Sequence, residues 1–217
     1  ELGDITFTGA VDLGTGGLII TDAAVVEVSN TFAAQSFLQS DGTNTTTFDN
    51  NTDIVTSFAF TGQALTMSGA SNDMDTSMTV TNAGVFTTGE AAVLDVGTDF
   101  IQNGAGTNVI GDNIIADSMS FLRAVVLTST DTIVLQTGEG AGDDVTFSAG
   151  LTETNNPGLT IDAGAAGDIT FTGAVDLGTG GLTITDAAVV EVSNTFAANS
   201  FLQSDGTNTT TFDNNTD

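Results

Sequence analysis

The chain has 217 residues, of which 28 are Asp or Glu and only one, Arg123, is Lys or Arg, so its formal charge is −27. Nucleic acids and anionic membrane surfaces are excluded as partners, because both are bound through Lys and Arg side chains that replace counterions. His and Cys are absent and Lys is not used, so catalysis by an imidazole, a thiol or an amine is excluded too. A hydrophobic content of 40% is enough to build a sizeable core.

Short segments in which apolar residues alternate with Thr or Asp run along the whole chain. In chain order they include residues 4–9 (DITFTG), 77–84 (SMTVTNAG), 131–138 (DTIVLQTG) and 181–187 (GLTITDA). A period of two, many β-branched residues and Gly, Asn or Asp at the ends predict short β-strands. The segment 23–40 could be taken for a helix, but its β-branched residues favour a strand there as well.

The chain contains a long internal repeat. Residues 3–53 match residues 167–217 at 49 of 51 positions; the two differences are Ile19 against Thr183 and Gln35 against Asn199. The step from Gly3 to Gly167 is the long period, and it predicts a tandem array. We expect residues 1–217 to form one continuous rod, with 3–166 as one full repeat and 167–217 as the start of the next.

A shorter period lies inside the long one. Phe147 and Phe171 occupy equivalent places in similar phrases, and so do Gly158 and Gly181. Strands joined by Gly-rich turns at this spacing predict an all-β fold, a parallel β-solenoid (β-helix) with about 23 to 24 residues per coil and about seven coils per 164-residue repeat. Because one coil cannot cover its own apolar side chains, those of neighbouring coils must bury one another. This expectation covers Ile5, Phe7, Ile169, Phe171, Leu182 and Ile184.

Three acidic stretches have the oxygen spacing of calcium ligands. The first, DNNTD, begins at Asp49 and begins again at Asp213; the second is DMDTS and the third is GEGAGDDV. Ca²⁺ is therefore the one cofactor we consider, although none is required, and each stretch alone also fits an Asx turn. The candidate metal-ligating residues are Asp49, Asn51, Asp53, Asp73, Asp75, Asp143 and Asp144.

Several other features have two interpretations. Thr-x-Thr pairs, such as Thr170 and Thr172, occur on ice-binding solenoids and also on ordinary solvated strands. Arg123 could join neighbouring rods or could be an edge residue with a buried stem. Asp143 and Asp144 could be the carboxylate pair of a carbohydrate-active β-helix enzyme. Near-identical tandem copies argue against that enzyme, because a catalytic site is rarely needed in every repeat.

The phrases GDITFTGAVDLGTGGLTITDA and GLTIDAGAAGDITFTG resemble the repeat regions of large bacterial β-solenoid surface proteins of the filamentous-haemagglutinin type. The resemblance implies a secreted stalk, adhesin or surface fibre. We therefore expect a non-catalytic structural protein, located outside the cell or at its surface, without membrane insertion in this segment. Its expected partners are further copies of its own repeat, in the same chain and in neighbouring chains. The alternative is an adhesive module that presents one solenoid face to carbohydrate, mineral or ice.

Overall fold

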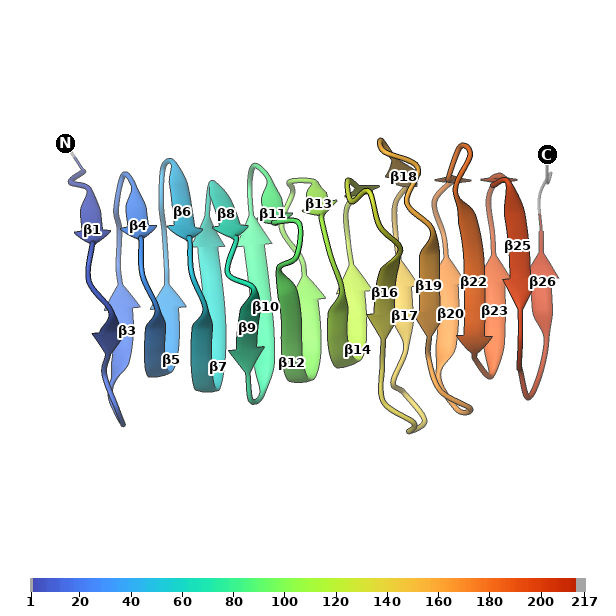
Figure 1. Cartoon of the computed structure of the whole chain (residues 1–217), viewed down its shortest axis with the longest axis horizontal. Coiled ribbons are helices and arrows are strands. Elements are labelled where there is room, and N and C mark those ends of the chain that lie inside the picture. The colour runs from blue at the N-terminus through green and yellow to red at the C-terminus, as the bar shows by residue number, and fades with distance from the viewer. Residues whose placement is uncertain (1, 214–217) are drawn as a thin grey trace.

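The computed structural model describes residues 2–213 and confirms a parallel β-solenoid of about ten turns (Figure 1). All secondary structure in these residues is β, including the segment 23–40, which was predicted as strand. The coils follow one another along the long axis, so the first and last strands lie at opposite ends. Every strand pair is parallel.

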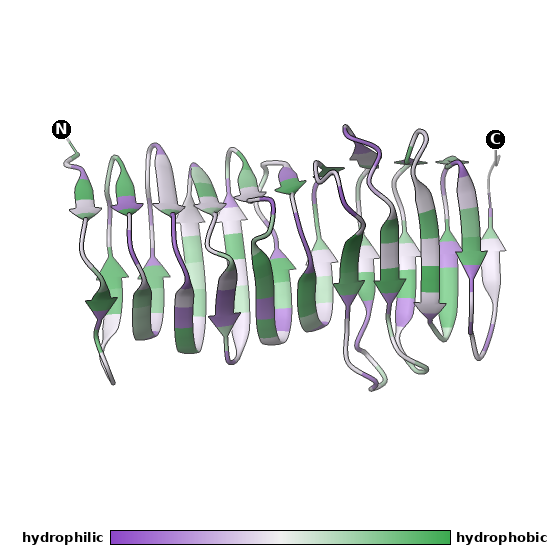
Figure 2. Cartoon of the chain, viewed as in Figure 1, coloured by the Kyte–Doolittle hydropathy of each residue, from purple (hydrophilic) through white to green (hydrophobic). Residues whose placement is uncertain are grey.

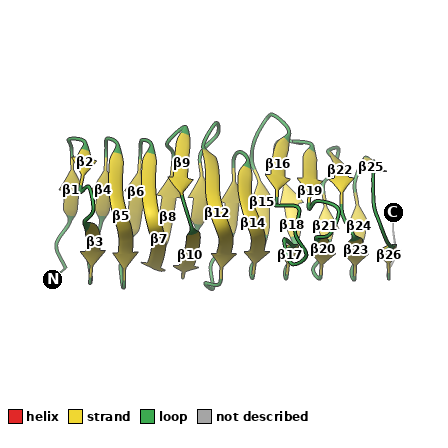
Figure 3. Ribbon diagram, turned by 90° about the horizontal axis from the view of Figure 1, so that it is seen from below, coloured by secondary structure: helices red, strands yellow, loops and turns green. Residues whose placement is uncertain are grey.

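Each coil contributes a strand segment to each of three sides (Figure 3). Side 1 is the ten-stranded sheet. The sixteen-stranded sheet covers sides 2 and 3, because its long strands β5, β7, β12 and β14 turn from one side to the other and change partners. The N-terminal parts of these four strands belong to side 2 and their C-terminal parts to side 3.

The strands of side 1 are β1 (Ile5–Phe7), β4 (Val26–Val28), β6 (Thr45–Phe48), β8 (Ala64–Met67), β11 (Phe86–Thr88), β13 (Asn108–Ile110), β15 (Val125–Leu127), β18 (Leu151–Glu153), β21 (Val175–Asp176) and β24 (Phe196–Ala197). Those that turn from side 2 to side 3 are β5 (Phe32–Gln39), β7 (Thr52–Gly62), β12 (Val93–Gln102) and β14 (Ile114–Phe121). Side 2 also has β2 (Val11–Asp12), β9 (Ser71–Met74), β16 (Ile133–Gln136), β19 (Leu159–Asp162), β22 (Gly181–Asp186) and β25 (Ser200–Gln203). Side 3 also has β3 (Gly17–Ile20), β10 (Ser77–Asn82), β17 (Val145–Phe147), β20 (Asp168–Phe171), β23 (Val189–Val192) and β26 (Thr210–Phe212).

The coils are shorter on average than predicted and differ in length. A coil has about 21 residues, fewer than the sequence pattern predicts. On side 1, Asn108 pairs with Val125 across a short coil, and Val125 pairs with Leu151 across a much longer one. Extra residues enter at turns such as the one between β16 and β17. The predicted spacing holds between Phe147 and Phe171, which pair in adjacent coils. The coil between them is longer than the average coil of the rod.

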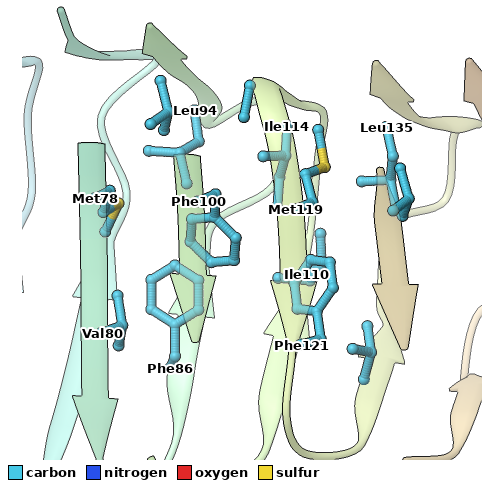
Figure 4. Close-up of a cluster of buried hydrophobic side chains, with 14 of the residues drawn as sticks. Met78, Val80, Phe86, Leu94, Phe100, Ile110, Ile114, Met119, Phe121 and Leu135 are labelled. Carbon is cyan, nitrogen blue, oxygen red and sulfur yellow. The ribbon is translucent and has the colours of Figure 1, made fainter. Parts of the chain in front are cut away.

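The core is a continuous column of apolar side chains from all three sides. Along the strands, hydrophobic residues alternate with more polar ones (Figure 2), and most of the hydrophobic residues are buried in the interior. In the middle of the rod, Phe86 from side 1, Leu94 from side 2 and Phe100 from side 3 meet in the interior (Figure 4). Phe rings also stack between coils, with 5.1 Å between the centroids of Phe147 and Phe171. The burial expected for Ile169, Phe171, Leu182 and Ile184 is confirmed, whereas Ile5 and Phe7 in the first coil are only half-buried.

The two copies of the repeat lie on different sides of the rod. Ile5 to Phe7 form β1 on side 1 of the first coil, but their copies, Ile169 to Phe171, belong to β20 on side 3 of the eighth coil. The offset between the copies is therefore seven coils plus two strand segments, not a whole number of coils. Identical sequence thus fits two different sides, and the division into blocks 3–166 and 167–217 stays a prediction.

Local hydrogen bonds are the same in both copies despite this shift. The Asp12 carboxylate accepts a hydrogen bond from the Gly14 amide at 2.9 Å, and its copy, Asp176, accepts one from Gly178 at 3.1 Å. Both glycines have positive φ, 54° and 48°, which a residue with a Cβ adopts only with strain. The turn is therefore encoded by the local sequence and does not depend on the side of the rod.

Candidate functional site

The most distinctive charged feature is a row of three carboxylates on side 2. Asp53 on β7, Asp73 on β9 and Asp95 on β12 are Cα partners in consecutive coils. Each is exposed and lies between buried residues, as Asp73 does between Asn72 and Met74. Alternation along a strand places all three side chains on the outer surface of the same sheet. We call these three residues the carboxylate row.

The electrostatic cost of the row is visible at its centre. Partial burial raises the pKa of the Asp73 carboxyl above its ordinary value, and the neighbouring carboxylates of Asp75, Asp95 and Asp53 raise this pKa further. At a coil spacing of roughly 4.8 Å, two unit charges repel by about 0.9 kcal/mol even at the dielectric constant of water. The fold therefore holds Asp73 in a place where its ionised form is disfavoured.

The structure separates the first predicted calcium stretch. Asp49 and Asn51 lie in the turn between β6 and β7, whereas Asp53 lies on β7 in the carboxylate row. The amide oxygen of Asn51 accepts a hydrogen bond from the Ser71 main-chain N–H at 3.2 Å. The stretch thus links two coils. Its second copy, from Asp213, lies mostly outside the described residues.

The second stretch contributes to the row through Asp73, and Asp75 follows just beyond the end of β9. Both side chains are exposed. A shallow hollow of about 330 Å³ lies beside Asp73, lined by residues that include Thr31, Asn51, Asp53 and Asp73. Asp53 and Asp73, singled out separately in the sequence, are therefore neighbours.

The third stretch forms a turn between β16 and β17. Asp143 Oδ2 accepts a hydrogen bond from the Gly140 N–H at 2.6 Å, which closes the turn. Asp144 Oδ1 accepts one from the Asp168 N–H of the next coil at 2.8 Å. Both carboxylates thus bind main-chain donors. Across residues 2–213, no three His, Cys, Asp or Glu side chains are grouped as a metal site would require, and calcium binding stays a prediction.

Sequence reasoning missed Asp95, the third member of the row. A signal was present, because Asp53, Asp73 and Asp95 each stand immediately before an inward apolar residue, Ile54, Met74 and Val96. Their nearly equal spacings fit a coil of about 21 residues. The longer coil predicted from the sequence concealed this regularity.

A second hollow, of about 530 Å³, follows the turns from side 3 to side 1 and is lined by residues such as Asp41, Thr61 and Gln63. Beneath these turns, buried amides form a ladder in which Gln102 Nε2 donates to Asn82 Oδ1 at 2.7 Å. Gln102 Oε1 accepts hydrogen bonds from Asn108 Nδ2 and from the Arg123 main-chain N–H, both at 3.2 Å. The ladder supports the turns, and it leaves the Arg123 side chain exposed at the edge of side 1.

Comparisons with protein-family models, with curated proteins and with solved structures found no match to this chain. In the part of the chain that the structure describes, no helix is long and apolar enough to cross a bilayer. The β-solenoid is compatible with β-solenoid repeat proteins in general, and the resemblance to haemagglutinin-type fibres rests on the sequence phrases alone.

Proposed function

We propose that the chain is a structural element, a length of stalk or fibre built from stacked coils and used outside the cell or at its surface. The observation that carries this proposal is the contrast between the two copies of one sequence. Leu13 in the first coil is 39% exposed, whereas its copy, Leu177, is 0% exposed with coils on both sides. Phe7 is half-buried, and its copy, Phe171, is fully buried. The same residues thus accept a further coil wherever one is present.

Main-chain hydrogen bonding supports the same proposal. Within the described residues, β1 pairs only with β4, while its copy, β20, pairs with both β17 and β23. An open strand edge with an apolar interior is stabilised by any coil that continues the ladder. A fold of this kind can be lengthened without a new core design, which suits a stalk.

The acidic surface also suits a fibre. With a charge of −27, rods repel one another over most of their surface, which opposes non-specific collapse. The proposed fibre needs no catalytic residue. Its interactions are coil to coil within the chain and rod to rod between chains.

Immunoelectron microscopy of the native full-length protein tests the proposal. An antibody against a surface segment of the repeat should label a fibre of constant width many times along its length, because each repeat block of seven coils plus two strand segments advances the rod by roughly 37 Å at about 4.8 Å per coil. Preimmune serum is the control. A compact particle carrying a single label would contradict the proposal.

A further inference from the structure

The turn between β12 and β13 contains the only Asn-Gly pair of the chain, Asn103 and Gly104. Asn103 is exposed to solvent, whereas Gly104 is buried. The main-chain N–H of Asn103 donates to the Val80 carbonyl of the preceding coil at 3.0 Å. Gln102 Nε2, a member of the buried amide ladder, donates to the Gly104 carbonyl at 3.3 Å. The main chain of the pair is therefore fixed on two sides, while the Asn103 side chain faces water.

The packing of the coils requires glycine at position 104. Gly104 lies directly against the preceding coil, where an added Cβ would overlap the main-chain N and O of Asn82. Asn82 is itself fixed, because its main-chain O accepts from the Gly106 N–H at 2.9 Å and its Oδ1 accepts from Gln102 Nε2 at 2.7 Å. Asn82 cannot move aside without breaking these hydrogen bonds. The fold thus places a residue without a side chain directly after Asn103.

Asn is a chemically labile residue, and its lability depends on the residue that follows it. The main-chain nitrogen of that residue can attack the side-chain carbonyl carbon of Asn, Cγ, and close a five-membered succinimide ring. Because both groups belong to one chain, the attacking atom is permanently close to its target. A side chain on the following residue obstructs the attack, and glycine has none. A pair such as Asn103 and Gly104 therefore has the least steric hindrance to ring closure.

Hydrogen bonding favours ring closure at this pair. Thr81 Oγ1 donates to Asn103 Oδ1 at 2.5 Å, so the hydroxyl stabilises the negative charge that attack on Cγ places on this oxygen. Within residues 2–213, Asn103 Nδ2 donates to no acceptor, and neither does the main-chain N–H of Gly104. An N–H without a partner is unfavourable in a buried residue, and ring closure removes it. The leaving nitrogen and the attacking nitrogen are thus both free of other hydrogen bonds.

Other candidate pairs in the chain lack one of these properties. Asn82 is buried, and its Nδ2 donates to the Gly84 carbonyl at 2.8 Å, which holds the leaving nitrogen in place. Gly42 follows an acidic residue, and its N–H donates to Asp41 Oδ1 at 2.7 Å. A charged carboxylate resists attack by a nucleophile far more than an amide does. The exposed side chain, the free nitrogens and the following glycine coincide at Asn103.

We propose that Asn103 is a site of spontaneous deamidation, at which the folded chain modifies itself over time. The Gly104 nitrogen forms a bond to Asn103 Cγ, the bond from Cγ to Nδ2 breaks, and the proton from the Gly104 N–H leaves with Nδ2 as ammonia. Water then opens the ring at either of its two carbonyls, which yields Asp or isoaspartate. Water is the only co-reactant. The inference does not depend on the proposed structural function.

Deamidation changes both the charge and the main chain of this turn. Asn103 continues an outward row of side 3 that contains the uncharged residues Thr61 and Thr81, so either product places a carboxylate in that row. Isoaspartate also adds one carbon atom to the main chain, next to the point where Gly104 packs against Asn82. We therefore expect the isoaspartate form to unfold at a lower urea concentration than the unmodified chain.

Prolonged incubation of the folded chain at mildly alkaline pH, in water enriched in oxygen-18, tests the proposal. Cleavage after Phe100 and Phe121 then releases a peptide with three Asn residues, of which buried Asn108 is an internal control. Mass spectrometry should find loss of the amide, with one oxygen-18 atom gained, at Asn103 before any other Asn. The rate should rise with pH, because the Gly104 nitrogen must lose its proton to attack.

Matched variants separate the chemistry of the pair from the effect of the fold. Asn103→Gln should abolish the modification, since the longer side chain closes a larger and less favourable ring. Its control Asn50→Gln, at another exposed Asn, should leave the rate at Asn103 unchanged. Thr81→Val should slow the loss severalfold, because it removes the hydroxyl that bonds Asn103 Oδ1. Thr61→Val removes a hydroxyl of the same row one coil away and should have no effect.

Retention of the amide at Asn103 in the folded chain would overturn the proposal. A synthetic peptide of residues 102–106, incubated alongside, shows that the conditions suffice for amide loss. Earlier loss at Asn50 or Asn155, or an unchanged rate after Thr81→Val, would also contradict the assignment. Far-ultraviolet circular dichroism is recorded throughout, and amide loss confined to samples without β-structure would count against a site in the folded rod.

Discussion

Matched substitutions in the two copies separate the effect of local sequence from the effect of stacking. Phe7 and Phe171 stand in identical sequence, but Phe7 is half-buried in the first coil and Phe171 is fully buried in the eighth. The Phe171 ring stacks on Phe147 with 5.1 Å between centroids and 5° between planes. We expect the two substitutions by Ala to differ in cost although the deleted atoms are the same.

The expected losses of stability follow from how completely neighbouring coils cover each Phe ring. Phe171→Ala should lower the free energy of unfolding by about 3 to 5 kcal/mol, as is usual for a buried Phe replaced by Ala. Phe7→Ala removes a ring that is covered from one end of the rod only, so the loss should be about half of that or less. If the first coil frays independently, the effect of Phe7→Ala on global unfolding is smaller still.

Urea denaturation followed by far-ultraviolet circular dichroism measures both variants, with the m-value checked against the parent chain. The control pair is Thr8→Ala and Thr172→Ala, whose side chains are exposed in both copies and should cost about 0.5 kcal/mol or less. Equal losses for the two Phe variants would refute the reasoning, because stability would then follow local sequence and not inter-coil burial.

Three further predictions concern charge and close packing. Asp73→Asn should raise stability at neutral pH by less than about 1 kcal/mol in urea unfolding, after screening of an exposed group. Because the pKa of Asp73 is raised in the folded state, the parent chain should lose stability as pH rises through that pKa, and the variant should not. Identical profiles of stability against pH would contradict repulsion within the carboxylate row. Millimolar Ca²⁺ should raise the melting temperature at low ionic strength relative to chelator, and less so after Asp95→Asn, whereas an unchanged melt in the parent chain would reject calcium binding. Gly97→Ala should lower the melting temperature, since a Cβ there overlaps the Asp75 carbonyl oxygen of the adjacent coil, and an unchanged melt would show that the coils can separate freely.

The sequence predicts the architecture well because the inward-outward alternation is the same on every side. Phe147 and Phe171, one of the pairs from which the coil length was taken, are indeed stacked partners, and the strand assignment of 23–40 is confirmed. The coil length was too long because it was extrapolated from the coils that have the longest turns. The number of residues in the turns varies from coil to coil, and the alternation of apolar residues within the strands does not reveal it.

The side of the rod on which a segment lies could not be predicted. Val26 belongs to side 1, whereas Leu94, at the matching place in a similar phrase further along the chain, belongs to side 2. All three sides require the same sequence pattern, a short strand with apolar residues facing inward, so a copy of one sequence can form a strand on any of them. For the same reason Asp53 and Asp73 were recognised singly, and Asp95 was not joined to them.

Nuclear Overhauser contacts in the uniformly labelled chain test the stacked-coil rod most directly. The account predicts parallel inter-strand contacts at unequal separations, including Thr6 with Glu27, Val109 with Val126 and Val126 with Thr152. It also predicts ring contacts between Phe147 and Phe171. Antiparallel contacts, or one uniform sequence separation between partners throughout the chain, would contradict it.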